Sequence, residues 1–204
     1  MTASFTHSCT RLARIILALV VAVTGIWPLA VHAAGIEVRQ ASLMATDEGF
    51  ELAADFAIDF PDVLEDAVNR GVALYFVAEF ELQRPRWYWF DERTVHRTQT
   101  WRLSYHALTR QYRVSRGPLH QNFATLSEAL DILSRVRRWQ VAERRELSPG
   151  ETYQAALRFQ LDLGQMPKPF QINAIANRDW ELGSNWYRFP FSPGSASAAV
   201  SESR

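Results

Sequence analysis

The chain has 204 residues, 48% of them hydrophobic and 12% aromatic, which is enough apolar surface for one folded domain but too little length for two. Its formal net charge is zero, so it lacks the basic surplus that binds phosphate backbones, and nucleic acid is not an expected partner. The only cysteine, Cys9, lies near the N-terminus, which excludes disulfides, thiol chemistry and zinc–cysteine sites from the rest of the chain.

The N-terminal segment has the features of an export signal. Two arginines precede the apolar run Ile15 to Ile26, and small residues that signal peptidase accepts follow up to Ala34. We therefore expect residues 1–33 to be a signal peptide that delivers the domain to the periplasm. The alternative is an uncleaved inner-membrane anchor through residues 15–34, because this length is sufficient to cross a bilayer.

Hydrophobic periodicity predicts a strand–strand–helix–strand order in the first part of the domain. Alternating residues indicate a half-buried strand from Phe50 to Phe60. The preceding segment, Ile36 to Met44, is separated from it by the turn signal Asp47-Glu48-Gly49, so the two strands are expected to form a hairpin. A short helix is expected between Pro61 and Gly71. Alternation then returns from Val72 to Gln83 and predicts a long strand.

The middle of the chain predicts a meander followed by a second helix. A turn at Arg84-Pro85-Arg86 is followed by three further predicted strands: Trp87–Val95, Thr100–His106 and Tyr112–Ser115. Thr125 and Glu128 match a capping box, which predicts a helix that runs to about Arg135. The segment from Arg137 to Glu146 is expected to return to strand.

The C-terminal part predicts more strands and a tail. Alternation is clean from Tyr153 to Leu163. The prolines of Met166-Pro167-Lys168-Pro169 predict an extended, non-helical connection. Short strands are expected at Phe170–Ala174 and Trp186–Phe189. Residues 192–204, which are mostly small, are expected to be a disordered tail.

Together these elements predict one mainly β domain over residues 34–191. Eight to nine strands and two short helices, joined by short connections, favour an antiparallel two-layer β-sandwich or a strongly curled sheet.

The densest chemical feature is the segment from Arg84 to Phe90. On a strand, its two tryptophans share one face while its tyrosine and phenylalanine share the other, so one pair can fill the core and the other can form an exposed platform. Such a platform would bind a sugar ring, a peptide or the lipid interface, with its arginines supplying cation–π or anion contacts. The alternative is that both pairs are core residues. The candidate binding residues are Arg84, Arg86, Trp87, Tyr88, Trp89 and Phe90.

Catalytic and metal-binding patterns are not recognisable in the sequence. The three histidines after the leader lack the paired spacing of a zinc site: His96, His106 and His120. Asp91 and Glu92 would point to opposite faces of a strand, and Asp179 with Glu181 has no evident partner. We therefore expect no catalytic residues, no metal and no cofactor.

Charge is unevenly distributed along the chain. The segment Glu37 to Glu81 is rich in acidic residues, whereas Arg84 to Arg145 holds most of the arginines. We expect these charges to pair across neighbouring strands. The alternative is an exposed arginine-rich face, which would attract anionic lipid headgroups or an acidic partner.

Several stretches of the chain resemble a known family. They are Arg86–Asp91, Leu103–Val114, Leu126–Leu130, Met166–Asn173 and Asp179–Leu182. On these stretches the chain resembles the exported proteobacterial family catalogued as domain of unknown function 4390. The resemblance implies no catalytic residue or ligand, because that family has no established activity. Its genes are often found near a nitrogen-regulation type sensor kinase, which implies a link to envelope signalling.

These observations favour a non-enzymatic periplasmic module for interaction or sensing near the inner membrane. The expected partner is an envelope protein, with a sensor kinase as the suggested link, and contact with the membrane surface is also expected. Two alternatives stay open: a small-ligand-binding β-sandwich that uses the segment from Arg84 to Phe90, and an unrecognised hydrolase.

Overall fold

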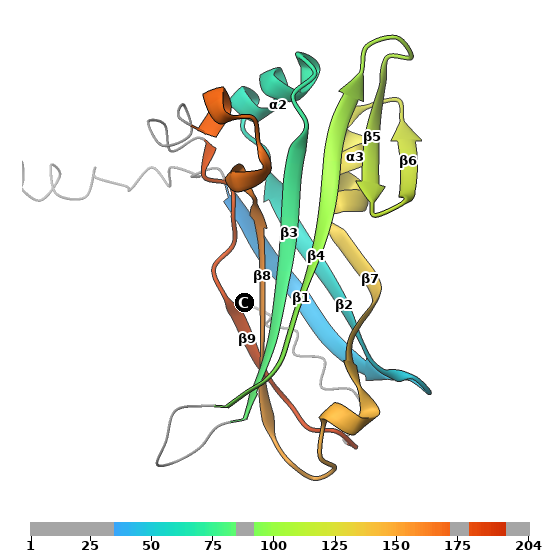
Figure 1. Ribbon diagram of the computed structural model, residues 1–204, viewed down its shortest axis with the longest axis vertical. Helices are drawn as coiled ribbons and strands as arrows, with labels where there is room; N and C mark the ends of the chain where they lie inside the picture. The colour runs from blue at the N-terminus through green and yellow to red at the C-terminus, as the bar shows by residue number, and fades with distance from the viewer. Residues whose placement is uncertain (1–34, 85–91, 172–179, 195–204) are drawn as a thin grey trace, which may run out of the picture. The chain divides into compact units, whose positions relative to one another are not determined.

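The structure, a computed structural model, describes residues 35–84, 92–171 and 180–194, which all belong to one compact unit beginning at Ala34 (Figure 1). The predicted leader and residues 195–204 of the predicted tail lie outside the described residues. No helix within the described ranges is long and apolar enough to cross a membrane.

The described residues form two antiparallel sheets, which confirms the mainly β prediction. The smaller sheet has the order β1-β2-β7, with bounds β1 Gly35–Ala45, β2 Gly49–Asp59 and β7 Arg135–Glu143. The larger sheet has the order β6-β5-β4-β3-β8-β9, with bounds β6 Leu119–Phe123, β5 Gln111–Arg116, β4 Glu92–His106, β3 Leu74–Arg84, β8 Tyr153–Leu161 and β9 Tyr187–Phe191. Strands β6 and β7, each at the end of its sheet, lie on the same side of the domain (Figure 1).

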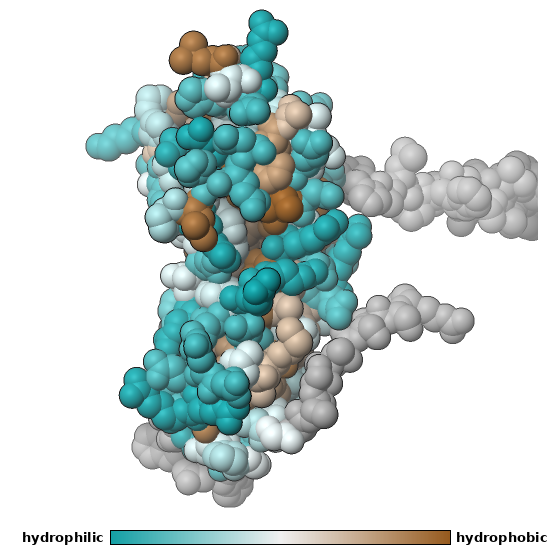
Figure 2. Space-filling view, turned by 90° about the vertical axis from the view of Figure 1, so that its right-hand side faces the viewer, coloured by the Kyte–Doolittle hydropathy of each residue, from teal (hydrophilic) through white to brown (hydrophobic). Residues whose placement is uncertain are grey.

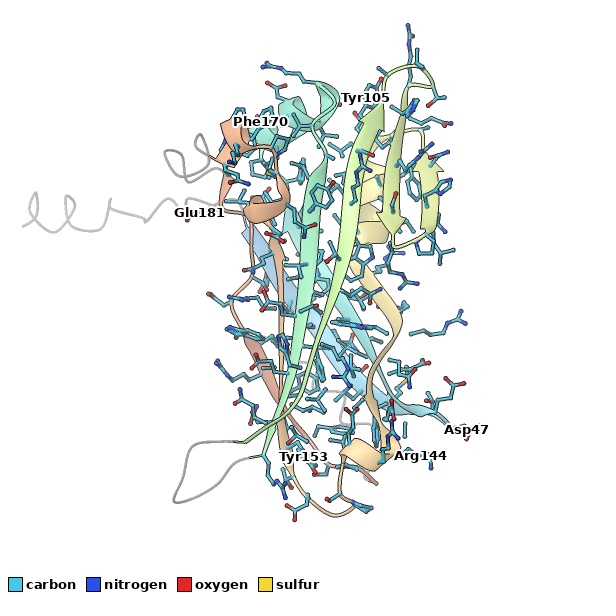
Figure 3. The ribbon with its side chains drawn as sticks, viewed as in Figure 1. Asp47, Tyr105, Arg144, Tyr153, Phe170 and Glu181 are labelled. Carbon is cyan, nitrogen blue, oxygen red and sulfur yellow. The ribbon has the colours of Figure 1, made fainter. Side chains whose placement is uncertain are left out.

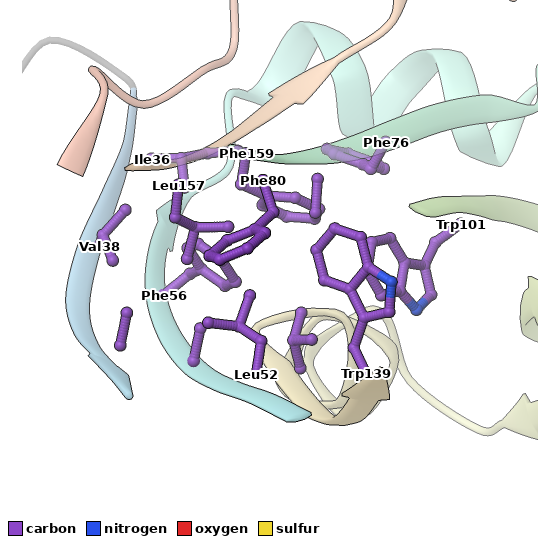
Figure 4. Close-up of a cluster of buried hydrophobic side chains, with 14 of the residues drawn as sticks. Ile36, Val38, Leu52, Phe56, Phe76, Phe80, Trp101, Trp139, Leu157 and Phe159 are labelled. Atoms are coloured by element: carbon purple, nitrogen blue, oxygen red, sulfur yellow. The ribbon is translucent and has the colours of Figure 1, made fainter. Parts of the chain in front are cut away.

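The core lies between the two sheets, where the alternating strands bury one face each (Figure 4). Phe159 of β8 is its centre and is fully buried. Its ring stacks on Phe56 of β2 at 4.7 Å and on Phe76 of β3 at 5.7 Å, and it meets the edge of Trp101 of β4 at 5.6 Å between centroids. These contacts join the sheets, as the predicted inward faces of β2, β3 and β8 require.

Both predicted helices form, and local sequence signals explain their ends. Helix α2 (Asp62–Asn69) begins after Pro61 and is followed by Gly71, whose φ of 89° suits glycine. Helix α3 (Leu126–Leu133) has the predicted capping box. The Thr125 hydroxyl accepts a bond from the Glu128 N–H at 3.2 Å, and the Glu128 carboxylate accepts one from the Thr125 N–H at 3.3 Å. Helix α3 ends earlier than predicted, because β7 begins directly after Ser134.

The end of the domain opposite α2 is fixed by side chains that bond to turns. Arg144, in the short 3-10 turn Arg144–Glu146, donates two hydrogen bonds to the carbonyl oxygen of Thr46, at 3.0 and 2.7 Å. The hydroxyl of Tyr153 accepts a bond from the Ser148 N–H at 3.0 Å. Figure 3 shows Asp47, Arg144 and Tyr153 at this end and Tyr105 and Phe170 at the other.

Two strand predictions in the middle of the chain are corrected. The predicted break between Val95 and Thr100 does not occur, since residues 96–99 continue the ladder with β3 and β4 is one strand. These four polar residues are typical of a loop in the sequence, but backbone hydrogen bonds to β3 hold them in the sheet. Strand β6 was not predicted, because four of its five residues are exposed and no buried face produces alternation.

The connection after β8 is also different from the prediction. A 3-10 turn (Leu163–Gln165) and a helical turn over residues 168–171 replace the expected extended segment, so Phe170 is not in a strand. The carbonyl of Pro167 accepts bonds from Phe170 N at 2.9 Å and Gln171 N at 3.4 Å. Prolines are compatible with this turn because N–H groups in the first turn of a helix have no intrahelical partner. The rest of the predicted strand, residues 172–174, lies outside the described residues.

Candidate anion-binding groove

A hollow of about 430 Å³ opens where the β5–β6 hairpin, helix α3 and strand β7 meet. Buried Trp101 and Val114 form part of its wall. On the face in Figure 2, which looks at this side of the domain, long hydrophilic side chains cross at mid-height beside exposed hydrophobic groups. The basic lining residues define what we call the arginine groove: Arg116, His120, Arg135, Arg137 and Arg138.

A β-bulge in β7 places two successive arginines in the groove. Leu52 of β2 pairs with Trp139 and Ala54 pairs with Val136, so Arg137 and Arg138 together stand opposite one residue of β2. Arg138 has a φ of 51°, in the left-handed region that costs a residue with a side chain roughly 1–2 kcal/mol. Regular pleating would have sent these two side chains to opposite faces.

The groove arginines differ in their partners. Arg137 is held by Asp55 at 2.5 Å and by the carbonyl oxygen of Ala54 at 2.8 Å. Arg135 forms a weak exposed pair with Asp131 at 3.5 Å.

The remaining two arginines have no carboxylate partner among the described residues. When the side-chain amide of Gln99 is oriented with its oxygen toward Arg116, this neutral oxygen accepts hydrogen bonds from Arg116 Nε at 3.1 Å and Nη1 at 2.9 Å. The side chain of Arg138 has no hydrogen bond or ion pair within the part of the chain that the structure describes. No aspartate or glutamate lines the groove, and the carboxylates of Asp55 and Asp131 pair with Arg137 and Arg135 from outside it. The positive charge of Arg116 and Arg138 is therefore not compensated by a carboxylate of the groove lining. Guanidinium groups that are not paired with a carboxylate can bind phosphate or carboxylate oxygens of a ligand.

The rim of the groove is apolar. Leu119, which begins β6, is 64% exposed, and Ile132, near the end of α3, is 41% exposed. The arginine groove is therefore amphiphilic: cationic groups and exposed aliphatic groups line the same hollow.

A larger cavity of about 730 Å³ lies between the end of β2 and α3, but acidic side chains outnumber basic ones in its lining. Three carboxylates line it, from Asp55, Glu65 and Asp131, together with Arg39 and Arg135. Beside it, Tyr112 donates to the side-chain oxygen of Asn69 at 2.6 Å, and burial, followed by the charge of Glu65, raises the pKa of Tyr112. The tyrosine therefore stays protonated and holds α2 to the larger sheet.

The predicted binding residues do not lie in the arginine groove. Of the six, the structure describes only Arg84, which ends β3 and is half-buried. This end of β3 lies at the end of the domain opposite α2 (Figure 1). The other five, Arg86 to Phe90, lie outside the described residues.

The histidines and carboxylates considered from the sequence are dispersed. His120 lines the groove, His96 lies 3.9 Å from Glu81, and His106 is exposed. Glu181 is exposed, while Asp91 and Asp179 lie outside the described residues. No group of three potential metal ligands occurs in the ranges that the structure describes.

The charge prediction is confirmed in part. Asp55 of β2 pairs with Arg137 of β7, as expected for neighbouring acidic and basic strands. Arg116 and Arg138 instead follow the alternative of an exposed arginine-rich face. The sequence signal for this face was the run Arg135-Val136-Arg137-Arg138, but nothing in it indicates the bulge.

Comparison with known proteins gives a match at the level of a family. A family model covers residues 33–190, most of the chain. No curated protein and no solved structure matches the chain.

Proposed function

Since the chain belongs to the family described as domain of unknown function (DUF4390), as its sequence resemblance indicated, we propose a function from the arginine groove. The domain is a non-enzymatic interaction module of the bacterial envelope. It acts near the inner membrane and binds an anionic partner through the groove.

The observation that carries this proposal is Arg138, an arginine with a left-handed backbone whose side chain has no partner among the described residues, in a groove without lining carboxylates. Charges on an edge strand such as β7 can also serve to block edge-to-edge pairing. Blocking edge-to-edge pairing requires a charged side chain on the strand, but it does not require that side chain at a position with left-handed backbone. Glycine is the residue that fits such a bulge position without strain. Local strain of this kind is typical of functional sites, and here its effect is to direct a guanidinium into the groove.

A non-enzymatic role is supported by the position of the two groups with shifted pKa values, Glu146 and Tyr112, because each is bound to structural partners. Burial would raise the pKa of Glu146, but hydrogen bonds from the Glu143 N–H at 2.7 Å and from Arg97 at 2.8 Å lower it below its ordinary value. Glu146 thus joins β4 to the turn after β7, and Tyr112 joins α2 to β5. Both groups have structural partners, whereas catalytic groups with shifted pKa values are typically found together in a cleft.

The export signal predicted in residues 1–33 supports a location outside the cytoplasm. The family's resemblance-based link to a sensor kinase suggests an envelope signalling protein as one partner.

Affinity capture from envelope extracts tests the proposal. The tagged protein is compared with the double variant Arg116→Gln/Arg138→Gln, which removes the two arginines that lack a carboxylate partner. The matched control is Arg70→Gln/Arg110→Gln, which removes two exposed charges outside the groove. We expect the groove variant to lose its captured partner and the control to retain it. Equal capture by both variants, with both folded, would refute the groove as the binding surface.

A further inference from the structure

We propose that the anionic group bound in the arginine groove is the phosphate headgroup of a membrane lipid. This inference rests on the proposed function and specifies its ligand. Three features of the groove support it: the concentration of positive charge, the exposed aliphatic rim and the interruption of the β7 edge.

The positive charge comes from separate elements that border one small hollow. Arg116 lies in β5, Arg135 begins β7 beside α3, and Arg138 lies in the bulge. A phosphate presents several acceptor oxygens at a single point, so it suits several guanidiniums around one hollow. Acidic side chains of an extended peptide are instead spaced along its length, at about 3.3 Å per residue.

The rim supplies the second feature. Leu119 and Ile132 expose aliphatic surface beside the guanidiniums, and two of the four most exposed large hydrophobic residues within the described ranges thus border this groove. A free anion has no apolar group that could cover these aliphatic side chains. A lipid carries hydrocarbon next to its phosphate, and covering Leu119 and Ile132 with it removes apolar area from water.

The bulge supplies the third feature. A peptide that joined the edge of β7 would pair its backbone with successive residues of that strand. The left-handed turn at Arg138 breaks this regular spacing, and bulges are a device by which edge strands avoid such pairing. Recognition at this point therefore depends on the side chains, and chiefly on the guanidiniums.

The chain offers a matched pair of variants for the test. Arg110 and Arg138 are the two non-glycine residues with positive φ in the described ranges, at 53° and 51°. Replacing either by glycine removes one positive charge and relieves the same backbone conformation, but only Arg138 lines the groove. Any difference in binding between Arg138→Gly and Arg110→Gly therefore reports the location of the charge.

Titration calorimetry with soluble short-chain lipids measures this difference without vesicles. We expect dihexanoylphosphatidylglycerol to bind and dihexanoylphosphatidylcholine not to bind, because the choline cation opposes the groove. Arg138→Gly should weaken binding of the anionic lipid by about tenfold, the effect of one lost charge-assisted bond. Arg110→Gly should leave its Kd within about twofold of that of the wild type.

Three results would overturn the inference. Equal binding of the two lipids would show that the headgroup charge is not recognised. Inorganic phosphate that binds as tightly as the anionic lipid would show that the rim contributes nothing. Binding of a glutamate-rich peptide but not of the anionic lipid would replace the lipid by an acidic protein, and the proposed interaction function would then stand. If the double variants Arg116→Gln/Arg138→Gln and Arg70→Gln/Arg110→Gln also behave alike in the capture experiment, the proposed function fails as well.

Discussion

Replacing Phe159 by alanine should remove a large part of the stability of the domain. The ring is fully buried and contacts three other rings, from Phe56, Phe76 and Trp101, in strands of both sheets. Truncation of a buried phenylalanine costs about 3–5 kcal/mol through lost transfer free energy and the cavity left behind. Each aromatic pair accounts for about 0.5–1.5 kcal/mol beyond area burial, so we expect the upper part of this range.

Urea denaturation followed by tryptophan fluorescence measures the effect. A cost of about 4 kcal/mol is a large fraction of the 5–15 kcal/mol typical of natural domains, and the unfolding midpoint should fall accordingly. Phe159→Leu, which keeps most of the volume, should cost less than half as much. Phe123→Ala, at a half-buried position of edge strand β6, should cost about 1 kcal/mol. A loss below about 1 kcal/mol for Phe159→Ala would refute the assignment of this ring as the link between the sheets.

Four further predictions concern single positions. Arg138→Gly should raise the free energy of unfolding by about 1 kcal/mol, or the Tm by about 2–4 °C, because glycine adopts this left-handed backbone conformation without strain. A lower Tm of the variant in calorimetry would show that the backbone of Arg138 is not strained. Glu146→Gln should cost about 1 kcal/mol at neutral pH. Because the folded state lowers the pKa of Glu146, its stabilisation is present above the ordinary glutamate pKa and disappears as pH falls through the lowered value, so wild type and variant should converge in acid denaturation curves. Gly49→Ala should cost more than about 1 kcal/mol, since its Cβ would collide with the carbonyl oxygen of Ala142, and an unchanged urea midpoint would exclude this close approach. N-terminal sequencing of the protein from cell envelopes should find Ala34 first, whereas an intact Met1 would favour the anchor.

Local patterns in the sequence predict the parts of this fold that depend on one buried face or on neighbouring residues. The alternation of β2, β3 and β8 reports burial directly. The capping box of α3 involves residues three apart, so it is visible in the sequence. Strand β6 and residues 96–99 of β4 carry no such signal, because pairing with a neighbouring strand, and not side-chain burial, holds them in the sheet.

The arginine groove depends on tertiary structure in a way that the sequence conceals. As part of a regular strand, Arg137 and Arg138 would point to opposite faces. The register of β7 against β2 creates the bulge that brings both to one hollow, and the glycine that usually marks a left-handed bulge position is absent. Arg116 reaches the same hollow from β5, through the packing of the β5–β6 hairpin beside α3.

Backbone NMR during titration with dihexanoylphosphatidylglycerol tests the central claim, that the arginine groove is the binding surface of this domain. We predict that the largest amide shifts occur in the β5–β6 hairpin, at the end of α3 and in β7 from Arg135 to Trp139. These shifts should be reduced in Arg138→Gly and unchanged in Arg110→Gly. Shifts concentrated in residues 84–92, where the arginines and aromatic residues of the sequence-based candidate lie, or the absence of saturable shifts in β7, would contradict the account.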